Sequence, residues 1–303
     1  MLLKDRALVC DRYLKEIEVR IASDRRRGAT QLYLDALLIL KKWMEHEVPD
    51  EVCFKRMLAA LVRGQPSMAP MLNLANDMLL ALEMGWDRVF QKVEAALKGL
   101  SESMDRIVKA GVERLSRYGC FITTSYSSTV RELFRGIAGV RRVSLVVSKG
   151  DPFAHGLNLA RELSDEDIDI SITFDALAPY LVKDVQAAVV GADAVEERGV
   201  VNGAGTFPLA LAARHWGVPL FVVCSTDKFL PPLLSRYHVI KDESVELDGV
   251  EGFPVVHRAF DVTPVELVTA FITEKGVMGP EEYREFIATK SVSGYFHSLL
   301  EEY

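Results

Sequence analysis

The sequence predicts an α/β protein in which a helical N-terminal domain is followed by a Rossmann-like domain with a parallel sheet. Up to about residue 110, apolar residues recur at helical spacing and strand signals are almost absent. After Gly119, short β-rich runs alternate with helical segments, a pattern typical of parallel strands joined by right-handed crossovers. Since 303 residues suffice for two domains, we place them at residues 1–114 and 115–303.

The first domain is expected to contain five amphipathic helices. Asp50 and Ser67 precede two of them and are suited to cap a helix start, because their short polar side chains accept hydrogen bonds from backbone N–H groups. The expected helices are Asp11–Ala22, Thr30–Met44, Asp50–Leu61, Met68–Met84 and Trp86–Gly111.

The second domain is expected to alternate strands and helices. The expected strands are Cys120–Thr124, Arg142–Val147, Ile168–Phe174, Ala187–Gly191, Leu220–Cys224 and His238–Ile240. The expected helices are Ser128–Gly136, His155–Leu163, Leu177–Leu181, Thr206–Trp216 and Thr263–Gly276. In such a fold, ligands bind at the carboxyl ends of the strands.

Composition and charge narrow the classes of function. A net charge of −7 argues against nonspecific nucleic-acid binding, so we expect no direct nucleic-acid partner. No apolar run is as long as a membrane span, and the N-terminus has no signal-peptide core, so we expect a cytoplasmic protein without a membrane partner.

Cysteine and histidine usage gives no sign of a metal or cofactor. Cys10, Cys53, Cys120 and Cys224 are scattered, and we interpret them as reduced thiols. The six histidines have no metal-ligand spacing, and the chain has neither a Walker loop nor a nucleophile elbow. We therefore expect no metal and no cofactor.

The segment from residue 188 to residue 206 carries the strongest functional signal. Its strand is expected to place Asp193 at a carboxyl tip, where a carboxylate can act as a general base or bind a hydroxyl. The loop Asn202-Gly203-Ala204-Gly205-Thr206 then opens a helix, and free N–H groups at a helix start bind anions. The alternatives are a capping role for Asp193 and a tight loop that needs small residues only for its backbone angles. Because Pro208 replaces the third glycine, the loop is a weak dinucleotide fingerprint.

Two further segments have residue types that suit a phosphate. Thr124 and Ser127 lie in a hydroxyl-rich stretch between a strand and a helix, where Ser127 or Ser128 can also cap the helix. Arg27-Gly28-Ala29 precedes a helix in the first domain, where it either binds an anion or forms part of a solvated surface.

Taken in order, these segments resemble the family of initiation factor 2B alpha, beta and delta subunits. That family also includes isomerases that act on methylthioribose-1-phosphate and on ribose-1,5-bisphosphate. The resemblance spans almost the whole chain and implies a helical domain followed by a Rossmann-like domain that dimerises. It also draws on Gln65-Pro66-Ser67-Met68-Ala69-Pro70 with Asn73, on Lys228-Phe229 and on Phe260-Asp261-Val262-Thr263-Pro264.

In the isomerases, the resemblance implies a thiol and a carboxylate on either side of the sugar. The carboxylate corresponds to Asp193, whereas Ser125 stands at the position of the thiol and is a far weaker acid. A loop lysine corresponds to Gly203, and a loop arginine corresponds to Asp151, before Pro152. These changes remove a thiol and two cations from the implied site.

Two other cysteines are candidate replacements for the thiol. Cys120 lies five residues before Ser125 on the same strand, which puts it on the opposite face and about 16 Å away at the usual strand rise. Cys224 is better placed, at the end of a neighbouring strand, but a free buried cysteine is usually structural.

The residues and the resemblance together predict a non-catalytic, ligand-binding or regulatory family member that binds a phosphorylated sugar or nucleotide, or a protein partner. A role in the regulation of translation is what the resemblance implies. Two alternatives stay open: an aldose–ketose isomerase for one of the two ribose phosphates, and a structural subunit with a closed pocket. We expect a homodimer or higher homo-oligomer and a translation-factor partner. The predicted site comprises Asp193 and Ser125 as the catalytic pair, if one exists, with Arg27, Gly28, Ala29, Thr124, Ser127, Asn202, Gly203, Gly205 and Thr206 as ligand-binding residues.

Overall fold

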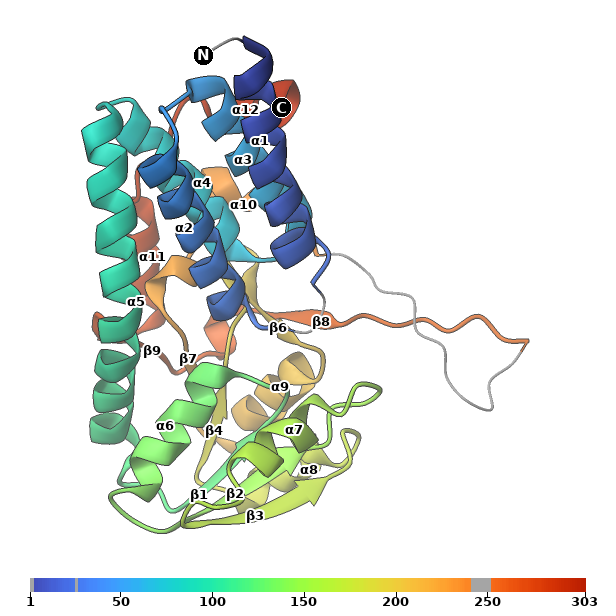
Figure 1. Ribbon diagram of the computed structural model, residues 1–303. Coiled ribbons are helices and arrows are strands. Elements are labelled where there is room, and N and C mark those ends of the chain that lie inside the picture. Colours follow the sequence, from blue (N-terminus) through green and yellow to red (C-terminus); the bar gives the residue numbers. More distant parts are fainter. Residues whose placement is uncertain (1–2, 25–26, 241–251) are drawn as a thin grey trace. The chain divides into compact units, whose positions relative to one another are not determined.

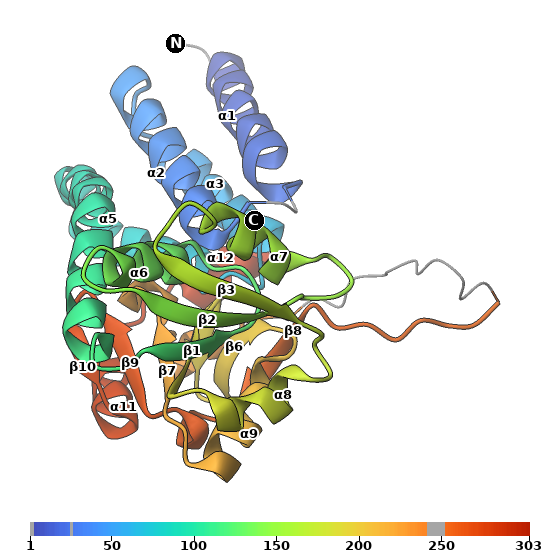
Figure 2. The same cartoon turned by 90° about the horizontal axis from the view of Figure 1, so that it is seen from below.

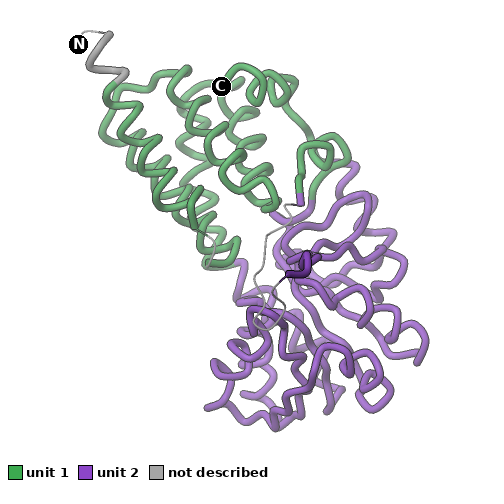
Figure 3. Tube along the Cα trace, turned by 90° about the vertical axis from the view of Figure 1, so that its right-hand side faces the viewer, with its two compact units in different colours: residues 1–102, 230–239, 290–303 green, residues 103–229, 240–289 purple. Residues whose placement is uncertain are grey.

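The computed structural model describes residues 3–24, 27–240 and 252–303 (Figure 1). The chain divides into two compact units, coloured separately in Figure 3. A helical unit contains residues 1–102, 230–239 and 290–303, and a sheet unit contains residues 103–229 and 240–289. The predicted fold class is confirmed, because a helical N-terminal region precedes a largely parallel sheet. The domain boundary at residue 114 stays a prediction.

The helical unit contains the five expected helices, with shifted ends, and two short helices that were not predicted, α10 (Pro232–Ser235) and α12 (Phe296–Glu302). Its other elements are α1 (Leu3–Ile17) with a π-helical turn at Glu18–Ala22, α2 (Ala29–His46), α3 (Glu51–Gly64), α4 (Ala69–Leu82) and the start of α5 (Trp86–Leu115). Asp50 caps α3 as predicted, accepting a hydrogen bond from the Cys53 N–H at 2.8 Å.

Two predictions at the edge of this unit are wrong. Ser67 does not cap α4; the N-cap is Met68, and the Ser67 hydroxyl donates to the Val239 carbonyl at 2.7 Å. Residues 238–240 form no strand, because the Val239 N–H donates to the Pro66 carbonyl and His238 Nε2 lies 2.9 Å from the Ser67 carbonyl. These contacts tie a distant segment to the turn before α4.

The cysteines of the helical unit also differ from the prediction. Cys10 of α1 and Cys53 of α3 form a disulfide bond with 5.6 Å between their Cα atoms. The two residues are 43 positions apart and carry no spacing signal, because only the packing of α1 against α3 brings them together. The interpretation of all four cysteines as reduced thiols is therefore wrong for this pair.

The sheet unit contains a seven-stranded sheet in the order β10-β9-β7-β4-β1-β2-β3 (Figure 2). The pairs among β9, β7, β4, β1, β2 and β3 are parallel, and β10 is antiparallel to β9. The strands are β1 (Cys120–Thr123), β2 (Val143–Ser148), β3 (Ile168–Thr173), β4 (Ala187–Val190), β7 (Leu220–Val223), β9 (Ala270–Thr273) and β10 (Gly276–Met278).

Helices cover both faces of this sheet because its central strands β4, β7 and β9 are apolar and buried on both faces. The helices are α6 (Ser128–Ala138), α7 (His155–Glu162), α8 (Ala178–Leu181), α9 (Thr206–Trp216) and α11 (Pro280–Ala288). Ala187 and Val189 of β4 pack with α5, α6 and α7, whereas Ala188 and Val190 pack with α8, α9 and α11. Figure 2 shows α6 and α9 on opposite sides of the central strands.

A second, three-stranded sheet was not predicted. It has the order β5-β6-β8 and consists of β5 (Ala194–Glu196), β6 (Gly199–Gly203) and β8 (Phe260–Thr263), all antiparallel. The prediction of a helix over Thr263–Gly276 is wrong, since this region ends β8, makes a 3₁₀ turn at Val265–Leu267 and forms β9. The β9 segment is buried on both faces and lies between β7 and β10, so it has no amphipathic alternation.

The part of the chain that the structure describes contains no helix long and apolar enough to cross a membrane. Within the same residues, no group of three or more His, Cys, Asp or Glu side chains is arranged to hold a metal ion.

Candidate functional site

The predicted residues of the sheet unit converge at the carboxyl edge of its central strands. β1 ends at Thr123, β4 at Val190 and β7 at Val223, and parallel pairing brings these ends to one edge. Asp193 lies three residues after the end of β4, is half-buried, and donates its N–H to the Val201 carbonyl at 2.8 Å. The hairpin of β5 and β6 then returns the chain to the loop that opens α9.

The hydroxyl-rich stretch after β1 packs directly on the glycines of the α9 loop. A Cβ atom at Gly203 would lie 2.2 Å from Ser125 Oγ, and one at Gly205 would lie 3.2 Å from Thr124 Oγ1. Ser125 has a φ of 66°, a left-handed conformation that non-glycine residues adopt at a cost. Gly203 is therefore required for close approach, and the Ser125 side chain occupies the space that a side chain at Gly203 would fill.

The same packing continues to the start of α6. A Cβ atom at Gly191 would lie 2.6 Å from Ser127 Oγ and 3.8 Å from Asn202 Oδ1. Ser127 caps α6 as predicted, accepting a hydrogen bond from the Val130 N–H. The structure thus brings Ser127 and Asn202 to the same glycine.

Asn202 and Thr206 form an internal hydrogen-bonded pair. The Asn202 amide donates to Thr206 Oγ1 at 2.9 Å, and the Thr206 hydroxyl donates to the Gly203 carbonyl at 2.8 Å. Both side chains are almost fully buried. These bonds fix the loop conformation, while the prediction that the two residues also bind a ligand stays a prediction.

The N–H groups at the start of α9 are not free, contrary to the expectation. Asp261 Oδ2 accepts hydrogen bonds from the N–H groups of Gly205 and Phe207, at 2.8 and 3.0 Å. Asp261 lies on β8 directly opposite Asn202 of β6, so sheet pairing holds its carboxylate in place. Burial raises the pKa of Asp261, and the N–H groups of Phe207, Gly205 and Thr206 oppose that rise.

Asp261 lies in one of the segments that carry the family resemblance, but the sequence indicates no role for it. Its contacts with α9 span more than 50 residues, and they depend on a strand pairing that was not predicted. The one sequence feature that bears on this role is the position of Asp261 in Phe260-Asp261-Val262-Thr263-Pro264, a β-rich run before a proline.

The thiol and ammonium groups near Asp193 are buried. Cys224 has no exposed surface, and burial raises the pKa of its thiol to about 12, an effect that Lys228 opposes. The Lys228 side chain is 6% exposed, and its ammonium donates to the Ala192 carbonyl at 2.5 Å, next to Asp193. Cys120 lies at the opposite end of β1, with its sulfur 3.9 Å from the Asp184 carbonyl, so it does not replace the thiol.

The loop after β2 is organised by a carboxylate. Asp175 accepts hydrogen bonds from the N–H groups of Gly150 and Asp151, at 2.8 and 2.7 Å, and from the Ser148 hydroxyl. Burial alone would raise the pKa of Asp175, but these hydrogen bonds and Lys149 outweigh it and lower the pKa. Lys149 also pairs with Asp151 at 2.7 Å. The loop in which the family resemblance implies an arginine therefore holds two carboxylates, Asp151 and Asp175, together with Lys149.

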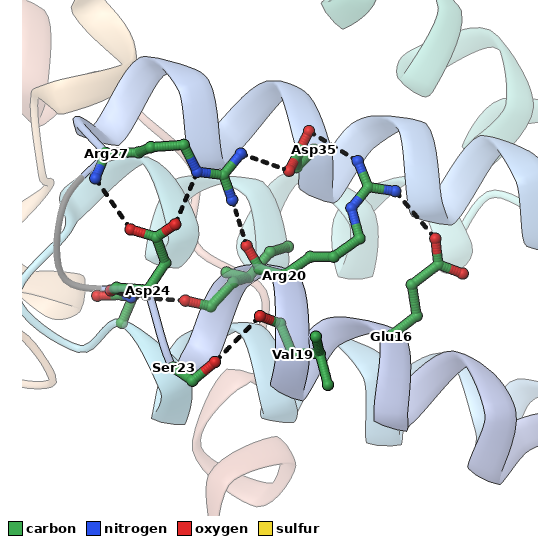
Figure 4. A network of polar contacts seen from close by, with 9 residues as sticks. Glu16, Val19, Arg20, Ser23, Asp24, Arg27 and Asp35 are labelled. Carbon is green, nitrogen blue, oxygen red and sulfur yellow. Dashed lines mark hydrogen bonds and ion pairs between the residues drawn. The ribbon is translucent and has the colours of Figure 1, made fainter.

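Arg27 belongs to the helical unit, where its guanidinium takes part in a network of ion pairs (Figure 4). Nε contacts Asp24 at 2.7 Å, Nη1 contacts Asp35 at 2.8 Å, and Nη2 donates to the Arg20 carbonyl at 2.5 Å. Gly28 is the N-cap of α2, and Ala29 is its first residue. The network gives Arg27 a structural role, and its predicted contact with a ligand stays a prediction.

Comparison with known proteins gives the family. Residues 25–280 match the Initiation factor 2 subunit family. The chain belongs to this family. It is 31% identical to a translation initiation factor eIF-2B subunit 2-like protein of Pyrococcus abyssi, over 89% of this chain and 97% of that protein. It is 27% identical to a methylthioribose-1-phosphate isomerase of Heliobacterium modesticaldum, over 94% and 92%.

A solved structure agrees with these matches. The crystal structure of the Pyrococcus horikoshii translation initiation factor eIF-2B superposes with a TM-score of 0.76 at 28% identity, covering 89% of this chain and 97% of that one. The family thus contains both initiation-factor-like proteins and sugar-phosphate isomerases that are similar to this chain over most of its length.

Proposed function

We propose that this chain is an initiation-factor-2B-like regulatory protein that binds a small phosphorylated ligand and does not isomerise it. The observation that carries the proposal is the packing of Ser125 on Gly203. At the position that corresponds to the thiol of the isomerases, the chain has a hydroxyl, which is a far weaker acid. Because Gly203 has no side chain, the lysine that the resemblance implies there is absent as well.

The other thiols support the same proposal. The two cysteines outside the disulfide bond among the described residues are Cys120 and Cys224. Cys120 lies at the wrong end of its strand, and the Cys224 thiol stays protonated near neutral pH because its pKa is about 12. Neither thiol suits proton transfer to or from a sugar carbon at neutral pH.

An active isomerase is the second candidate, and the placement of Asp193 favours it. The carboxylate of the implied catalytic pair is retained at a strand end, and the buried Lys228 ammonium holds the preceding carbonyl. In this alternative, Asp193 acts as the acid–base group, while Ser125 or Cys224 polarises the sugar.

The two functions are separated by an assay of ketose formation. The purified chain is incubated with ribose-1,5-bisphosphate and with methylthioribose-1-phosphate, and the products are followed by NMR. The proposal expects no turnover of either sugar. Turnover by the unaltered chain would overturn the proposal if Asp193→Asn abolishes that turnover and the exposed control Asp165→Asn leaves it unchanged.

Ligand binding is tested by thermal shift with the same two sugars and with nucleoside monophosphates. The proposal expects a saturable rise of the melting temperature with at least one of them, because a ligand that binds the native state stabilises it. Asp193→Asn is expected to weaken that ligand about tenfold, the usual effect of losing a hydrogen bond to a charged group. No saturable shift with any compound would instead favour a structural subunit with a closed pocket.

We also propose that the chain acts in the cytoplasm as a homodimer or higher homo-oligomer and engages a translation-factor partner. The family membership and the initiation-factor name of the Pyrococcus abyssi relative support this assignment. Light scattering on the purified chain is expected to give at least twice the chain mass of 33.8 kDa. A particle of the single-chain mass at micromolar concentration would contradict the oligomer.

A further inference from the structure

The first turn of α9 has the geometry of an anion site, and a carboxylate of the chain itself already occupies it. The N–H groups of Gly205 and Phe207 point at one oxygen of Asp261, at 2.8 and 3.0 Å. The next residue, Pro208, has no N–H group to offer. Converging N–H groups at the start of an 11-residue helix attract negative charge, and here the charge is internal.

The carboxylate is held by the sheet rather than by a mobile loop. Asp261 pairs with Asn202, and Phe260 pairs with Gly203, in the antiparallel register of β6 and β8. Its second oxygen, Oδ1, is buried without a hydrogen-bond partner among the described residues. A phosphate that approached the same N–H groups would find their position filled by Oδ2 and would meet the unpartnered Oδ1 beside it.

We propose that Asp261 is a specificity-determining residue that excludes phosphate from the N-terminus of α9. This role of Asp261 rests on the proposed ligand-binding function, because it concerns how a phosphorylated ligand is oriented at the carboxyl edge of the sheet. The phosphate of such a ligand therefore binds elsewhere. The phosphate-binding role that the sequence suggested for Gly205 and Thr206 is thereby reassigned to internal capping by Asp261.

Removal of the carboxylate tests the proposal. Inorganic phosphate is titrated by calorimetry into the full chain, Asp261→Ala and Asp261→Asn, with potassium chloride at matched ionic strength as the control. We expect Asp261→Ala to bind phosphate at least tenfold more tightly than the unaltered chain, because it vacates the N–H groups. Asp261→Asn is the matched control: its amide oxygen still accepts the N–H bonds, so we expect no gain.

The NMR signals of the Gly205 and Phe207 amides show directly whether phosphate binds at the start of α9. In the unaltered chain, we expect phosphate to leave both amide resonances in place, and in Asp261→Ala we expect both to shift. A shift of both signals in the unaltered chain would overturn the proposal. So would a folded Asp261→Ala chain without any gain in phosphate affinity. If that variant does not fold, Asp261→Ser replaces it, and the measurement on the unaltered chain still decides.

Failure of this inference is distinguishable from failure of the proposed function. A chain that binds a sugar phosphate but gains no phosphate site in Asp261→Ala retains the function and loses the inference. A chain that binds no sugar phosphate but gains a phosphate site in Asp261→Ala retains the inference and loses the function.

Discussion

At the scale of single residues, Ser125 and Gly203 form a matched pair. A Cβ atom at Gly203 would lie 2.2 Å from Ser125 Oγ and 2.7 Å from its Cβ. We therefore expect Gly203→Ala to lower the free energy of unfolding by about 1–3 kcal/mol, the usual cost of overpacking. Adding Ser125→Gly is expected to recover most of this loss, because glycine removes both clashing atoms and adopts the positive φ without strain.

Urea unfolding of the two single variants and the double variant measures this coupling. Gly99→Ala is the control, since a Cβ atom at Gly99 meets nothing within 4 Å. Additive effects of Gly203→Ala and Ser125→Gly would show that the two residues do not share the space assigned to them.

Cys224 gives a second prediction at this scale. Because its thiol is fully buried and has a pKa of about 12, roughly one molecule in ten thousand carries the reactive thiolate at pH 8. We expect iodoacetamide at pH 8 to modify the half-buried Cys120 in the folded chain and to reach Cys224 only in denaturant. Mass spectrometry of the digested protein identifies the modified cysteine. Equal labelling of both in the folded chain would contradict the buried placement of Cys224.

The sequence predicted the local partners of the site better than the distant ones. Ser127 caps α6, and Asn202 and Thr206 sit at the α9 loop, because each depends on neighbours within a few residues. The role of Asp261 was missed, because it requires β8 to pair with β6 across more than 50 residues. Short-range patterns do not contain the register of such a pairing.

At the scale of elements, the disulfide bond joins α1 to α3. It closes a loop of 43 residues, and the loss of such a constraint typically costs about 2–4 kcal/mol. We expect Cys53→Ser, or reduction with dithiothreitol, to lower the stability of the helical unit by that amount. Cys120→Ser is the control, since Cys120 is not in the disulfide bond. Identical denaturation midpoints with and without reductant would contradict the bond.

The elements that the sequence predicted correctly are those in which apolar residues recur at a clear helical or strand spacing. α9 has the predicted bounds, Thr206–Trp216, and β1, β2, β3, β4 and β7 lie within one residue of theirs. The strands of residues 260–278 were missed because β9 is buried on both faces, and a short apolar run of this kind also fits a buried helix. The proline at position 264, read as a helix start, instead follows the end of β8.

At the scale of the whole molecule, neither compact unit is formed by one continuous stretch of the chain. Residues 230–239 and 290–303 belong to the helical unit, although almost 130 residues of the sheet unit precede the first of them. Phe296 and Leu299 of α12 are almost fully buried, and the Asn76 side chain bonds both the Ser291 carbonyl and the Ser293 N–H. The C-terminal segment is therefore a structural part of the helical unit.

Deletion of residues 290–303 is expected to destabilise the helical unit selectively. The deletion removes two buried apolar side chains and leaves the buried Asn76 amide without its partners, each of which costs stability. Hydrogen–deuterium exchange is expected to show faster exchange in α3 and α4, which contact α12, and unchanged protection in β1, β4 and β7. The milder variant Phe296→Ala is expected to give the same pattern at a cost of about 3–5 kcal/mol. Equal loss of protection in both units would show that the C-terminal segment stabilises the molecule as a whole.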